Sequence, residues 1–176
     1  MIRSKGYTLI ELMIAVGLFA VVMLMASGAY IMMIGLSRQA QGIATGIDNL
    51  SFALETMTRT IRTGHGYSCG GALNLGDCND GRNTFTFVDE SSRTTSYSLS
   101  SGAIQRQVSA GAWSPLTDSS SIRIDSLKFY VFGSGPVAVD RQQSHATIII
   151  TGTVLGEKTP QSFTIETGAT MRGSDI

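Results

Sequence analysis

The chain has 176 residues, which is the size of a single domain with some additional length. Its 13 basic and 13 acidic side chains cancel, so no positive field attracts nucleic acid, and we expect no nucleic-acid partner. Charged residues make up 15% of the chain, below the roughly 25% of ordinary soluble domains. Two cysteines are too few for a disulfide-rich scaffold. This composition fits a small domain with one segment that is apolar enough to cross a membrane.

The apolar segment lies near the amino terminus, where Leu12 to Ser37 carry no charge. As a helix it would be about 39 Å long, enough to cross the ~30 Å hydrocarbon core and too long for a secretory signal. Arg3 and Lys5 precede it without any acid, so the positive-inside rule leaves this end in the cytoplasm. We expect one crossing of the inner (cytoplasmic) membrane, in contact with lipid, with everything after Arg38 outside.

A single carboxylate, Glu11, lies at the head of this segment. A charge at the centre of a bilayer costs roughly 2.5–3.5 kcal/mol, and less near an end, so a partner is expected. The next cation along the same helix is Arg38, about 40 Å away. The partner of Glu11 should therefore come from another chain or from a newly made amine. The alternative is a headgroup position, favoured by the helix dipole.

The segment KGYTLIEL, from Lys5 to Leu12, resembles the processing site of type IV prepilins and type II secretion pseudopilins. A short basic leader with Arg3 and Lys5 ends in Gly6, and an aromatic residue, Thr, Leu and a Glu precede the apolar helix. Tyr7 replaces the commoner Phe. The resemblance implies that prepilin peptidase cuts between Gly6 and Tyr7 and that Tyr7 is then N-methylated.

The same resemblance implies how the chain would assemble. Glu11 would neutralise the amine of a neighbouring subunit and so set the register of docking. The partners would be prepilin peptidase, other pilins or pseudopilins and the inner-membrane assembly platform, and no cofactor is implied. After assembly the chain would belong to a pilus or pseudopilus.

Beyond Arg38 the apolar residues recur at helical spacing. They are Ile43, Ile47, Leu50, Leu54, Met57 and Ile61. Together with the apolar segment they predict one helix from about Thr8 to about Thr63, ended by Gly64 and Gly66. We expect the stripe to pack on the chain's own globular part, and a coiled-coil seam is the alternative. Gly42 and Gly46 are either ordinary glycine usage or a close-packing site for a second helix.

After Gly66, short alternating runs predict strands. The runs are 84–88, 95–99, 103–108, 126–132, 146–155 and 162–170, with a loop over 133–144. The simplest arrangement is one antiparallel sheet on the apolar stripe. This is an α+β, pilin-like fold, which the resemblance also implies. Its segments would be a leader (1–6), a membrane and filament-core helix (7–37), an amphipathic continuation (38–64) and a β-sheet head (65–176).

Cys69 and Cys78 are expected to pair outside the cytoplasm and to close a surface loop. Free thiols or a metal pair are the alternatives. The polar residues between Asp77 and Asn83 predict turns, with weak calcium binding as the alternative. His65 and His145 lie in no catalytic motif, so neither an enzyme nor a metal site is expected.

These patterns indicate a structural subunit. The segment from Leu54 to Arg62, which leads from the helix to the sheet, resembles minor members of the family. We therefore expect a minor pilin or a J-type pseudopilin. The alternative is a single-pass, membrane-anchored binding domain outside the cytoplasm that is never cleaved and does not polymerise.

Overall fold

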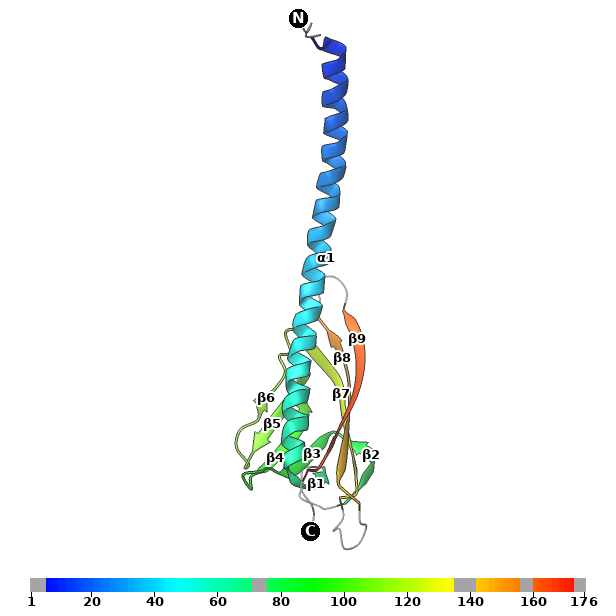
Figure 1. Ribbon diagram of the computed structural model, residues 1–176. Coiled ribbons are helices and arrows are strands. Elements are labelled where there is room, and N and C mark those ends of the chain that lie inside the picture. The colour runs from blue at the N-terminus through cyan, green and yellow to red at the C-terminus, as the bar shows by residue number, and fades with distance from the viewer. Residues whose placement is uncertain (1–5, 71–75, 135–141, 156–159, 173–176) are drawn as a thin grey trace, which may run out of the picture. The chain divides into compact units, whose positions relative to one another are not determined.

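The computed structural model describes residues 6–70, 76–134, 142–155 and 160–172 (Figure 1). One helix, α1 (Leu9–Thr63), confirms the predicted helix almost to the residue. The strands that follow are β1 (His65–Cys69), β2 (Cys78–Arg82), β3 (Thr84–Val88), β4 (Thr94–Ser100), β5 (Ala103–Val108), β6 (Ser114–Pro115), β7 (Ile122–Phe132), β8 (His145–Val154) and β9 (Gln161–Thr170). The chain divides into two compact units, Met1–Ala40 and Gln41–Ile176.

The strands form two antiparallel sheets instead of the single sheet that we expected. The five-stranded sheet has the order β1-β3-β4-β5-β6, and the four-stranded sheet has the order β2-β7-β8-β9. All six predicted strands are present. The short strands β1, β2 and β6 were missed, because their Gly, Asn, Asp and Pro residues resemble turns. Strand β1 belongs to one sheet and β2 to the other. The strands that the sequence analysis missed therefore determine how the chain is divided between the two sheets.

Strand β7 begins four residues before its predicted start. The pairing of β7 with β8 shifts register between Ile124 and Ser126. A bulge of this kind inserts one extra residue and reverses the in–out alternation. Asp125 therefore breaks the apolar pattern, and the sequence alone could not join Ile122 to the rest of the strand.

The second unit is built around the amphipathic part of α1, which packs against the sheets. Its buried residues are Gly46, Leu50, Ala53, Met57 and Ile61. The prediction that the apolar stripe covers the chain's own sheets is thus confirmed for most of its members. Ile47 is the exception, because 52% of its surface stays exposed.

An aromatic cluster joins the two sheets. The ring centroids of Phe85 on β3 and Phe129 on β7 lie 5.3 Å apart, and those of Phe87 and Tyr97 lie 5.9 Å apart. The Tyr97 hydroxyl lies 2.6 Å from the Thr60 hydroxyl on α1. Burial raises the pKa of Tyr97, and the hydrogen bond to Thr60 offsets part of that rise. The cluster therefore links both sheets and the end of the helix.

Gly46 marks a close approach between α1 and β8. A Cβ atom at this position would lie 2.6 Å from Cγ1 of Val154, which is itself buried. The spacing of Gly42 and Gly46 had left open a site at which a second helix packs closely. Within the second unit, however, Gly46 lies against the chain's own sheet. Only a residue without a side chain allows this packing.

We expect Gly46→Leu to lower the free energy of unfolding by about 1–3 kcal/mol, because the added side chain overpacks the contact with Val154. Urea unfolding of the full chain in detergent, followed by Trp113 fluorescence, measures the change. Ala44→Leu is the matched control, since Ala44 is exposed on the same helix. Equal effects of the two substitutions would show that the close approach is unimportant.

Asp89 organises the turn between β3 and β4. Its Oδ1 accepts hydrogen bonds from the backbone N–H groups of Ser91 and Arg93, each at 2.9 Å, and its Oδ2 forms an ion pair with Arg93 at 2.9 Å. Burial raises the pKa of Asp89, but the hydrogen bonds from Arg93 and Ser91 outweigh it, so the net pKa is lowered. The carboxylate form is therefore favoured in the folded chain.

This lowered pKa predicts a pH dependence of stability. The contribution of Asp89 is complete above the ordinary carboxyl pKa of 3.8 and is lost as the pH falls through the lower pKa of the folded state. Asp89→Asn should therefore be less stable than the wild type at neutral pH, and the difference should shrink on acidification. Urea midpoints of both chains across this pH range test it, with Asp48→Asn on the exposed helix surface as control. A constant difference would contradict the assignment.

Candidate processing and assembly site

The amino-terminal end of α1 is defined by Thr8. Gly6, Tyr7 and Thr8 lie ahead of the helix, and the first helical hydrogen bond runs from the Leu12 N–H to the Thr8 carbonyl oxygen, at 3.2 Å. Thr8 therefore occupies the N-cap position, where Thr is among the favoured residues. The boundary leaves Gly6 and Tyr7, the expected cleavage residues, outside the helix.

Thr8 and Glu11 form a reciprocal capping box. The backbone N–H and the hydroxyl of Thr8 donate to Oε2 of Glu11, at 3.3 and 3.2 Å. In return the Glu11 N–H donates to the Thr8 hydroxyl oxygen, at 3.3 Å. This is the arrangement of a Thr-x-x-Glu helix start, in which each side chain satisfies a backbone donor of the other residue.

The capping box gives Glu11 a hydrogen-bonding partner that we did not expect. Thr8 donates two hydrogen bonds to the Glu11 carboxylate, and its hydroxyl oxygen accepts one from the Glu11 N–H. The cationic partner expected from another chain or from a new amine stays a prediction. The signal was present in the sequence, since Thr8 and Glu11 have the capping-box spacing. Thr8 is thus a site residue that the sequence reasoning missed.

The capping box satisfies hydrogen bonds but does not compensate charge. Within the described residues the ion pairs are Arg93–Asp89 and Arg123–Asp125, and neither involves Glu11. Arg3 and Lys5, the basic leader residues, lie outside the described residues. The Glu11 carboxylate at the helix start therefore still lacks a cationic partner in the described part of the chain.

A new amine at Tyr7 would be made close to this carboxylate. Consecutive backbone nitrogens are at most about 3.7 Å apart. Because the Thr8 nitrogen lies 3.3 Å from Oε2 of Glu11, the Tyr7 nitrogen lies within about 7 Å of the same oxygen. An amine there would interact with Glu11 without any rearrangement of α1.

The expected cleavage residues are accessible. Tyr7 is 88% exposed, and apart from the adjacent residues no atom lies within 4 Å of a Cβ built on Gly6. Among the described residues of the first unit, nothing blocks proteolytic attack on the peptide bond between them. The positions are suited to processing, although cleavage and methylation themselves remain predictions.

The helix that follows is apolar and uncovered within its own unit. Large apolar side chains from Leu9 to Leu36 are exposed, the least of them, Ile34, by 37%. In the described residues α1 is long and apolar enough to cross a membrane. Such a surface requires lipid or other apolar helices around it.

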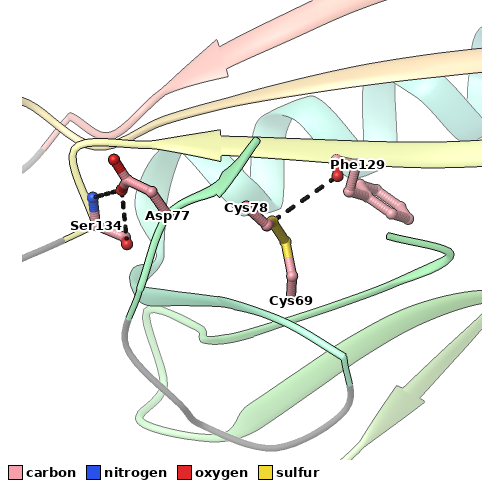
Figure 2. Close-up of a disulfide and its surroundings, with 5 residues drawn as sticks. All are labelled: Cys69, Asp77, Cys78, Phe129 and Ser134. Atoms are coloured by element: carbon pink, nitrogen blue, oxygen red, sulfur yellow. Dashed lines mark hydrogen bonds between the residues drawn. A yellow bond between two sulfur atoms is a disulfide. The ribbon is translucent and has the colours of Figure 1, made fainter. Parts of the chain in front are cut away.

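A second feature is the disulfide between Cys69 on β1 and Cys78 on β2 (Figure 2). The two Cα atoms are 6.4 Å apart. The pairing confirms the expected disulfide and removes the alternatives of free thiols or a metal pair. Cys78 itself is buried in the core, and its sulfur lies 3.9 Å from the Phe129 carbonyl oxygen. The bond joins the edges of the two sheets, and most of the loop that it closes, residues 71–75, lies outside the described residues.

Asp77 has a structural role beside this disulfide (Figure 2). Its Oδ1 accepts hydrogen bonds from the backbone N–H and the hydroxyl of Ser134, at 2.9 and 3.0 Å. These bonds lower the pKa of Asp77 despite some desolvation. Asp77 thus ties the start of β2 to the end of β7. The predicted turns between Asp77 and Asn83 were wrong, because Cys78–Arg82 form strand β2 and Asp77 bonds to a residue far away in the sequence. Among the described residues, no three His, Cys, Asp or Glu side chains are grouped to hold a metal ion.

The family model of the prokaryotic N-terminal methylation motif matches residues 1–27. This match covers the expected leader, the capping box and the first part of α1, and it supports a type IV pilin-like character for the amino terminus. No curated protein and no solved structure matches the chain.

Proposed function

We propose that the chain is the precursor of a filament subunit, either of a type IV pilus or of a type II secretion pseudopilus. The observation that carries the proposal is the methylation motif over residues 1–27, with Gly6 and Tyr7 exposed directly ahead of the helix cap. A structural subunit of this kind needs no catalytic site. The basic residues Arg3 and Lys5 support an orientation with the amino terminus in the cytoplasm and the sheets outside it.

In this proposal α1 has two environments in turn. Before assembly, its apolar half is solvated by lipid of the inner membrane. After prepilin peptidase removes residues 1–6, the assembly platform moves the helix out of the bilayer, and other subunits cover the same surface. Glu11 meets the methylated amine of Tyr7 on a neighbouring subunit, which favours one axial register because a buried carboxylate without a cation is costly.

Within this class we propose a minor subunit, pilin or J-type pseudopilin. The support is the sequence from Leu54 to Arg62, which resembles minor members where α1 leads into the sheets. Quantitative immunoblotting of sheared filaments tests this subdivision. A minor subunit should be present at a small fraction of the main filament protein, whereas comparable amounts would make it a major subunit.

The mass of the mature protein tests the proposed processing. Mass spectrometry of the chain purified from its native membrane should show a start at N-methylated Tyr7, with residues 1–6 removed. Deleting the prepilin peptidase should restore a chain that begins at Met1. An intact Met1 in a peptidase-positive cell would favour the alternative, a membrane-anchored binding domain that does not polymerise.

A further inference from the structure

Strand β9 is an edge of the four-stranded sheet, and in the part of the chain that the structure describes no strand pairs with its outer side. The two sheets have four edge strands among the described residues, namely β1, β6, β2 and β9. Strand β6 has two residues, and the pairings of β1 and β2 both contain register shifts. By contrast, β9 has ten residues, which pair with β8 in unbroken register. Natural sheets shorten, bulge or charge their edges to prevent strand addition. In β9 the only charge is Glu166.

An apolar groove lies between α1 and the four-stranded sheet, reaching from Ile122 of β7 and Val154 of β8 to this edge. Its volume is about 260 Å³, and its lining includes Phe163 and Ile165 of β9 and Ile43, Ile47 and Leu50 of α1, without any charged residue. Here Ile47 keeps 52% of its surface exposed, although it belongs to the apolar stripe of the helix. The four-stranded sheet therefore ends before it covers this part of α1.

The occupant that fits both features is an extended strand. Alternate N–H and C=O groups on the outer edge of β9 need partners, which a strand supplies and a helix does not. Every second side chain of an added strand would point into the groove, towards Ile47. Glu166 is exposed on the opposite face of the sheet, where a basic residue of the added strand would be the favourable neighbour.

A second copy of the chain fits less well. Antiparallel pairing of β9 with its own copy relates the two chains by a two-fold axis and, near full register, sets Glu166 directly or diagonally opposite Glu166 of the second copy. Like charges placed in this way destabilise a strand pair. The occupant that fits is therefore a different protein.

We propose that β9 and its groove bind an extended segment of another protein, which adds a fifth strand to the four-stranded sheet. The segment is apolar at every second position and carries a basic residue opposite Glu166. This surface is independent of the amino-terminal processing site.

Selection of short random peptides displayed on phage tests the proposal, with the full chain in lipid nanodiscs as target. We expect peptides that alternate apolar and polar residues and carry a basic residue on the polar side. Glu166→Lys should change that preference from basic to acidic. Ile47→Asp should weaken binding by about tenfold or more, because it places a charge in the groove. Phe52→Asp is the matched control, since Phe52 is 65% exposed on α1 outside the groove.

Hydrogen exchange of the bound chain decides the binding mode. An added strand should slow exchange at alternate amides of β9, those that face away from β8. The proposal is overturned if no peptide family is selected, or if the selected peptides leave the β9 amides exchanging freely. It is also overturned if those amides are already protected in the free chain, either by lipid or, in a concentration-dependent way, by a second copy. Thermal unfolding of each variant confirms that the fold is retained.

Discussion

Replacing Glu11 with glutamine should leave the precursor inserted and cleaved but reduce its incorporation into filaments by about tenfold or more. A glutamine oxygen can still accept the Thr8 N–H, so the capping box survives while the charge is lost. Two unit charges 4 Å apart interact by about 4 kcal/mol at an effective dielectric constant of ~20, and about 1.4 kcal/mol already corresponds to tenfold. Immunoblots of sheared filaments and of membranes measure incorporation, and mass spectrometry measures cleavage.

Glu11→Ala removes both the cap and the charge, so the pair of variants separates the two roles. We expect Glu11→Ala to insert normally and to incorporate as poorly as Glu11→Gln. Glu55→Gln, at an exposed position of the same helix, is the control. Normal incorporation of Glu11→Gln together with failure of Glu11→Ala would assign the function of Glu11 to the capping box. Normal incorporation of both variants would exclude a role in register.

Removing the disulfide by the double substitution Cys69→Ala and Cys78→Ala should lower the free energy of unfolding by about 2.5–3 kcal/mol. The value is the loop entropy of a closed loop of about 10 residues. It is a large share of the roughly 5–15 kcal/mol that stabilises a domain. Because the bond joins β1 to β2, its loss releases the covalent link between the edges of the two sheets.

Urea unfolding under oxidising and reducing conditions measures this effect. The wild-type chain in dithiothreitol should approach the midpoint of the double variant, and the double variant should not respond to the reductant. An unchanged midpoint in the double variant would mean that the aromatic contact between Phe85 and Phe129 and the helix packing hold the two sheets together without the bond.

Local patterns in the sequence were sufficient for several features of the molecule. The apolar run and the spacing of the stripe predicted α1 to within a residue at its start, because a helix repeats its buried face every 3.6 residues. Six strands followed from alternation between turn residues. The capping box could also have been read from the spacing of Thr8 and Glu11, since it depends only on neighbours within one turn.

The tertiary structure decided what those elements do together. Strands as short as β1 and β2 form only because longer strands supply their partners, so their membership of different sheets, and with it the burial of Cys78, has no local signal. The exposure of Ile47 has the same origin: periodicity places it on the apolar face, but the sheet ends beside it. A sequence pattern predicts which side chains are apolar and share one face of an element. Pairing between distant segments determines which of these side chains are buried in the folded chain.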